Sequence, residues 1–135
     1  MSKKGFVFVE EAAGTWFEHD DGWKVSLRIC SLDELKRIRK QTVKEKFSFK
    51  RLDGAPYRVK WDETDEDAQS LMIWDYCIVD WQEMYDKDGD TPLALNAENK
   101  VMLMNKSAKF AKFVTDSMTK LNDLQEQGKE VTEKN

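Results

Sequence analysis

Residues 47–61 read FSFKRLDGAPYRVKW, and this pattern sets the fold class that we expect. Aromatic and charged side chains alternate on both sides of a central Asp-Gly-Ala-Pro segment, residues 53–56. Alternation with a period of two is typical of a β-strand, and glycine and proline between two such runs favour a turn. The stretch therefore predicts a β-hairpin, whose aromatic rings we expect to face the core.

A helix is predicted immediately before this hairpin. Ser31 and Glu34 have the spacing of a capping box, in which each side chain binds the backbone amide of the other residue. Leu35 and Ile38 then lie on one apolar stripe among lysines and arginines. We expect this helix to run from Ser31 to about Lys46.

A second hairpin is predicted before that helix. Residues 24–29 alternate between polar and apolar side chains, which indicates a strand with one buried face. The turn-forming residues 19–22 precede them, and residues 15–18 supply the partner strand. Residues 6–9, FVFV, predict a further short strand.

A core helix is predicted after the hairpin that contains residues 47–61. Within residues 68–84, Leu71, Trp74, Ile78 and Trp81 recur at spacings of three and four. This spacing places the four side chains on one helical stripe, wide enough to pack against a neighbouring layer.

The remaining C-terminal part predicts a loop and further helix. Residues 85–95 are rich in turn formers, Asn96 caps the next helix, and residues 105–107 interrupt it before helical spacing resumes. The expected fold is α+β, with two N-terminal β-hairpins separated by a helix and followed by a mainly helical C-terminal half. We expect one domain over residues 1–127 and a flexible tail over residues 128–135.

Charge is distributed unevenly along a chain whose net charge is −4. Residues 36–60 contain ten basic residues and two acids, for a net charge of +8. Residues 61–90 contain eleven acids and one lysine, for a net charge of −10. Three interpretations are open: the two blocks neutralise each other inside one fold, they are solvated faces, or they steer subunits and partners together.

No constellation of residues predicts catalysis or metal binding. The EF-hand frame for residues 86–90 puts an apolar side chain at position twelve, where calcium requires a glutamate, so we expect a turn there. His19 is the only histidine, and we expect it to be a solvent-exposed loop residue. We therefore expect a protein that is not an enzyme and that holds no cofactor and no metal.

The chain begins without a stretch that predicts a signal peptide or a membrane span. We therefore expect a cytoplasmic protein that does not enter a membrane. In a reducing compartment Cys30 and Cys77 would be free thiols.

Residues 101–104 form a run of four apolar side chains on a predicted helix. One helix face is too narrow to bury all four. Either part of the run is exposed as an adaptable, methionine-rich binding surface, or the helix is wedged between two layers.

Seven short segments follow one another along the chain in a recognisable order. They are Trp16–Ile29, Ser31-Leu32-Asp33-Glu34-Leu35, Ile78-Val79-Asp80-Trp81, Asp88-Gly89, Thr91-Pro92-Leu93, Asn96-Ala97-Glu98-Asn99 and Val101–Met104. This order resembles the tail assembly chaperones of long-tailed bacteriophages and prophages. The resemblance covers roughly residues 15–125, and none of its positions is catalytic in that family.

The resemblance implies a non-enzymatic protein that binds the tape measure protein and keeps it soluble during tail assembly. Such a chaperone acts in the host cytoplasm and is absent from the mature virion, and copies of it would associate along the partner. The exposed apolar surface that we expect to touch the partner comprises Val101, Met102, Leu103, Met104, Phe110 and Phe113.

Two alternative functions remain open from the sequence. The basic segment, residues 36–60, with its interleaved aromatic residues is also typical of a nucleic-acid-binding protein. The acidic balance of the whole chain argues against nucleic acid as the partner. The other alternative is a structural tail component, which would remain in the virion.

Overall fold

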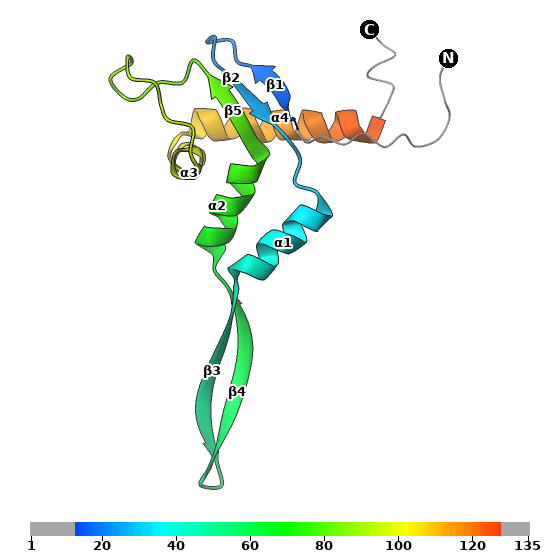
Figure 1. Ribbon diagram of the computed structural model, residues 1–135, viewed down its shortest axis with the longest axis vertical. Helices are drawn as coiled ribbons and strands as arrows, with labels where there is room; N and C mark the ends of the chain where they lie inside the picture. Colours follow the sequence, from blue (N-terminus) through cyan, green and yellow to red (C-terminus); the bar gives the residue numbers. More distant parts are fainter. Residues whose placement is uncertain (1–12, 128–135) are drawn as a thin grey trace.

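The computed structural model describes residues 13–127 and confirms the α+β class (Figure 1). Two β-hairpins are separated by a helix, and the C-terminal half is mainly helical. The elements in chain order are β1 (Thr15–Glu18), β2 (Lys24–Leu27), α1 (Leu32–Thr42), β3 (Val43–Leu52), β4 (Ala55–Thr64), α2 (Glu66–Cys77), β5 (Ile78–Gln82), α3 (Ala97–Lys106) and α4 (Ala108–Gln127). The strand expected at residues 6–9 and the tail expected at residues 128–135 lie outside the described residues.

A three-stranded antiparallel sheet in the order β1-β2-β5 forms the centre of the body. The predicted hairpin of β1 and β2 forms, so β1 pairs with one edge of β2. Strand β5 pairs with the other edge of β2. The prediction of a helix over residues 68–84 is therefore wrong from residue 78 onward. Helix α2 ends at Cys77, and residues 78–82 become a strand.

A β-bulge explains why this strand has the spacing of a helix. Val25 lies opposite Trp81 and Leu27 lies opposite Ile78, so the register shifts and Val79 has no partner of its own. The extra residue lets Ile78 and Trp81, three positions apart, point to the same face of the sheet. Both side chains are buried, with exposed fractions of 0% and 7%.

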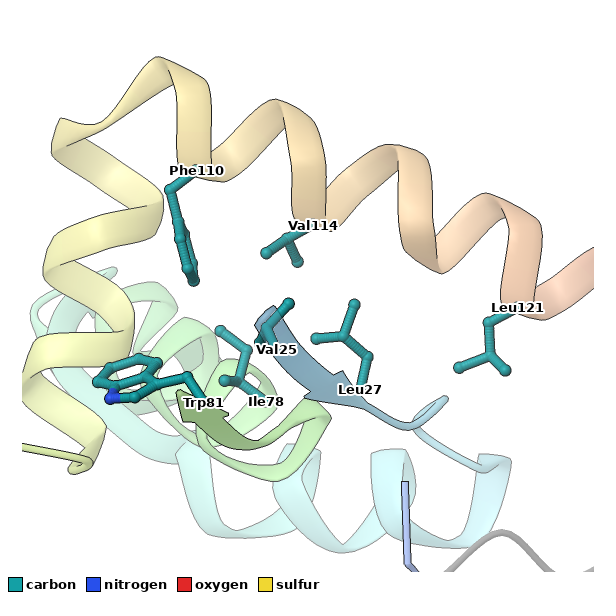
Figure 2. Close-up of a cluster of buried hydrophobic side chains, with 7 residues drawn as sticks. All are labelled: Val25, Leu27, Ile78, Trp81, Phe110, Val114 and Leu121. Atoms are coloured by element: carbon teal, nitrogen blue, oxygen red, sulfur yellow. The ribbon is translucent and has the colours of Figure 1, made fainter. Parts of the chain in front are cut away.

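Helix α4 covers this face of the sheet (Figure 2). Its buried side chains Phe110, Val114 and Leu121 follow the helical period and lie over the side chains of β2 and β5. The cluster shown in Figure 2 consists of Val25, Leu27, Ile78, Trp81, Phe110, Val114 and Leu121.

Helix α1 begins as predicted and ends four residues early. The Glu34 amide donates to the Ser31 hydroxyl at 3.2 Å, which confirms the N-cap. The helix stops at Thr42, not at Lys46, because Val43 is extended and pairs with Thr64 in the next hairpin. Residues 43–46 therefore exchange helical hydrogen bonds for those of a β-ladder.

The β3–β4 hairpin, residues 43–64, forms a two-stranded arm that projects from the body (Figure 1). At ~3.3 Å per residue, its ten-residue strands reach about 30 Å. Asp53 and Gly54 make the two-residue turn with φ angles of +52° and +78°. Positive φ at both positions is what the commonest hairpin turn requires, which explains the Asp-Gly pair.

The loop and the two last helices follow the sequence prediction. Residues 83–96 form the loop, and the Asn99 amide donates to the Asn96 side chain at 2.8 Å to cap α3. Ser107 interrupts the helix, after which α4 turns across the sheet (Figure 1). Among the described helices, none is both long and apolar enough to cross a membrane.

Leu27→Ala should destabilise the protein by about 2–5 kcal/mol, because truncating this fully buried side chain leaves a cavity under α4. Leu52→Ala is the matched control, since Leu52 is 67% exposed near the tip of the arm and should change stability by about 0.5 kcal/mol or less. Urea denaturation followed by circular dichroism measures both. Equal losses for the two variants would contradict the position of the core.

Candidate partner-binding surface

The aromatic side chains of the arm are exposed, which corrects the expectation that they face the core. Phe47, Phe49, Tyr57 and Trp61 have exposed fractions of 54%, 68%, 45% and 45%. The two strands of the arm contact mainly each other, and α1 and α2 lie at its base, where they cover neither face (Figure 1). A two-stranded sheet buries its side chains only when another layer covers it.

The strand register assigns the arm's side chains to two faces. Phe47 lies opposite Lys60 and Phe49 lies opposite Arg58, and these four side chains share face 1. The two phenyl rings meet edge to face, with centroids 5.9 Å apart, and the Arg58 guanidinium lies 4.6 Å from the Phe47 centroid. Glu45, on the same face, is 3.8 Å from Arg58 and 3.5 Å from Lys60. Face 1 thus holds its aromatic and charged groups against one another.

Face 2 has an apolar row beside a lysine row. Along β4, Tyr57, Val59 and Trp61 occupy alternate positions and therefore point to the same side. Lys50 lies opposite Tyr57 and Lys46 lies opposite Trp61, so the lysines line the neighbouring strand. A monomer that is stable in water rarely exposes large apolar side chains in such continuity.

The outer part of the arm is basic, and the rest of the chain is acidic. Residues 46–61 contain five basic residues and one acid, for a net charge of +4. The chain as a whole carries −4, so the remainder carries −8. The arm is therefore a cationic projection on an anionic body.

An acidic loop lies at the other end of the molecule. Residues 83–90 contain four acids and one lysine, and in Figure 1 they lie at the end of the long axis opposite the arm's tip. The Thr91 hydroxyl, the Thr91 amide and the Asp90 amide all donate to the Asp88 carboxylate, and these hydrogen bonds lower its pKa to about 2. Arm and loop of one subunit are thus too far apart to neutralise each other.

The same loop was the one candidate for a calcium site, and it forms a turn. Gly89 has a φ of +76°, and the Asp88 carboxylate is occupied by hydrogen bonds from within the loop. Across residues 13–127, no group of three or more histidine, cysteine, aspartate or glutamate side chains is placed to hold a metal ion.

The apolar run on α3, residues 101–104, is partly buried. It is neither a fully exposed binding surface nor fully covered by two layers, the two alternatives that the sequence left open. Leu103 and Met104 pack against the core cluster, and Met102 is half-buried. Val101 lines a groove of about 550 Å³ between α2 and α3, together with Leu71. The groove's other lining residues are Asp67, Ala68, Ser70 and Asn105.

The two phenylalanines expected beside this run have different environments. Phe110 is 3% exposed within the core, so it is removed from the expected contact surface. Phe113 is partly buried, and its ring meets those of Trp23 and His19 at centroid distances of 4.8 and 5.2 Å. His19 stacks on Trp23 at 4.5 Å, which corrects the expectation of a solvent-exposed histidine.

The two cysteines are free thiols in the structure. Burial raises the pKa of the Cys77 thiol to about 12, and burial also raises the pKa of the Cys30 thiol. Both groups are therefore protonated at neutral pH and are weak nucleophiles.

No known protein family matches the chain, and comparisons with curated proteins and with solved structures return no match. Sequence reasoning considered the arm only as part of an alternative nucleic-acid surface and missed the exposure of its rings, although the signal for that exposure is present in the sequence. Once Asp53-Gly54 is taken as a two-residue turn, the register pairs Phe47 with Lys60 and Trp61 with Lys46. Neither face then has an apolar width sufficient for a core.

Replacing residues 45–62 with Asn-Gly should leave the body folded. The new turn joins Lys44 to Glu63, which already lie opposite each other, and the arm contributes little to the body's core. We call this variant the short-arm protein and expect its body to lose about 0.5 kcal/mol or less. Thermal unfolding followed by near-ultraviolet circular dichroism measures this, and an unfolded body at 25 °C would contradict it.

Proposed function

We propose that this protein is a tail assembly chaperone of a long-tailed bacteriophage or prophage. It binds the tape measure protein, whose extended helices expose apolar faces before the tail tube surrounds them, and keeps it soluble. The protein makes and breaks no covalent bond. It acts in the host cytoplasm and leaves before the virion matures.

The exposed aromatic side chains of the arm carry this proposal. Four large rings project into solvent on an element that has no covering layer of its own. Aromatic residues supply much contact area at a small cost in conformational entropy, and they are enriched at protein interfaces. Such an arm is suited to covering another chain's apolar surface.

The groove between α2 and α3 is a secondary contact surface in this proposal. Val101, from the predicted set, lines this groove. Met102 is half-buried, and Leu103, Met104 and Phe113 pack against the core cluster. Phe110 has no place in it because that ring belongs to the core.

Co-expression with the tape measure protein tests the proposal. We expect the soluble fraction of that protein to rise several-fold, because the chaperone covers apolar surface that otherwise aggregates. The control is co-expression with an unrelated acidic protein of the same size. An unchanged soluble fraction would remove the proposal's central claim.

Virion composition separates a chaperone from a structural tail component. Mass spectrometry of purified virions should lack this chain if it is released during assembly. Its presence in stoichiometric amounts would instead assign it a structural role in the tail.

We further propose that copies of the chain associate head to tail, the basic arm of one copy meeting the acidic loop of the next. Opposite charge at the two ends of the long axis supports this arrangement (Figure 1). A contact between two different surfaces leaves each copy with one free end and so propagates. Several copies then cover a long partner.

Sedimentation velocity tests this association. We expect assemblies at about 50 mM salt that dissociate at about 500 mM salt, since the contact is electrostatic and exposed. Reversing the charge of the acidic loop with Asp86→Lys and Asp90→Lys should give a monomer at both salt concentrations. Assembly that is insensitive to salt and to this reversal would refute the head-to-tail contact.

A further inference from the structure

We propose that face 2 of the arm is the docking surface for an amphipathic helix whose apolar stripe is flanked by acidic residues. This rests on the proposed function, in which the tape measure protein supplies that helix. The surface consists of two rows, the apolar row Tyr57, Val59 and Trp61 and the lysine row Lys46 and Lys50.

The apolar row has the spacing of a helix stripe. Alternate residues on a strand are about 6.6 Å apart, because each residue rises ~3.3 Å. Residues four apart on a helix are separated by about 6 Å along the axis, because each rises 1.5 Å. Apolar residues on successive turns of a docked helix would therefore meet Tyr57, Val59 and Trp61 in order.

The lysine row selects the charge of the helix. Along the part of the chain that the structure describes, Lys46 and Lys50 are in no ion pair, whereas Arg58 and Lys60 on face 1 share Glu45. These two ammonium groups lie opposite the apolar row and attract carboxylates at the edge of an apolar stripe, whereas Lys44 lies opposite Glu63. They repel a helix with basic flanks, which gives discrimination as well as attraction.

The charge of the rest of the molecule favours a helix over two other occupants. A nucleic acid carries a charge at every phosphate, and beyond the arm it would meet a body with a net charge of −8. The arm of a second copy has the same net charge of +4 and would be repelled. An acidic-flanked helix places a few carboxylates beside the lysines and needs no further cations.

Two labelled helical peptides of about 20 residues serve as probes, both with the same leucine stripe, one flanked by glutamate and one by lysine. Fluorescence anisotropy with the full chain should show the glutamate-flanked peptide binding about tenfold or more tightly. Lys46→Glu with Lys50→Glu should reverse this preference. Tyr57→Thr with Trp61→Thr should weaken both peptides, since threonine keeps the strand while removing the rings.

Matched controls keep the result specific to face 2. Lys36→Glu with Lys40→Glu changes the net charge by the same amount on exposed positions of α1 and should leave the preference intact. Phe49→Thr removes a ring from face 1 and should also have little effect. Equal affinity for the two peptides, or an equal response to the α1 and face 2 reversals, would overturn the assignment.

The remaining outcomes are also decisive. If an oligothymidine of about 20 nucleotides displaces the peptide and binds more tightly, face 2 is a nucleic-acid surface and the proposal fails. If the short-arm protein still solubilises the tape measure protein, the chaperone function stands and the docking surface is elsewhere. If the peptides discriminate as expected but co-expression has no effect, face 2 binds acidic helices and the chaperone function is wrong.

Discussion

The pairing of β5 with β2 is the interaction on which the rest of the structure depends. It places Ile78 and Trp81 beside Val25 and Leu27, and this one face supplies the surface that α4 buries. Without β5, that surface would lose half of its side chains and α4 would have too little to cover. The same pairing fixes the end of α2 against the sheet, so α2 leads back toward the base of the arm (Figure 1).

This arrangement leaves the arm without a cover. The apolar side chains of α4 pack against the β1-β2-β5 sheet. Helix α1 ends and α2 begins at the base of the arm, so neither covers it. An isolated two-stranded ribbon is of marginal stability in water, so the arm relies on its cross-strand pairs and its two-residue turn. The exposed rings of the arm can be buried only when another molecule packs against them.

The two faces of the arm differ in how their charged and apolar groups are arranged. On face 1, Arg58 and Lys60 share the carboxylate of Glu45, while face 2 presents Lys46 and Lys50 in no ion pair beside an apolar row. The acidic loop lies at the far end of the molecule, where it is free to meet a neighbouring copy (Figure 1).

The sequence by itself determined the features that depend on neighbouring residues. The Asp53-Gly54 turn, the caps at Ser31 and Asn96 and the break at Ser107 are local, because a few backbone groups and adjacent side chains settle them. The fold class follows from their order along the chain.

Only the tertiary structure decided the fate of residues 78–82 and of the arm's rings. A bulge gave Ile78 and Trp81 a helical spacing within a strand, and that bulge exists only because β2 offers an edge. Likewise, alternation tells which side chains share a face but not whether another layer covers that face. A covering layer for the arm would require contacts between distant segments, and the apolar helix α4 packs on the β1-β2-β5 sheet instead.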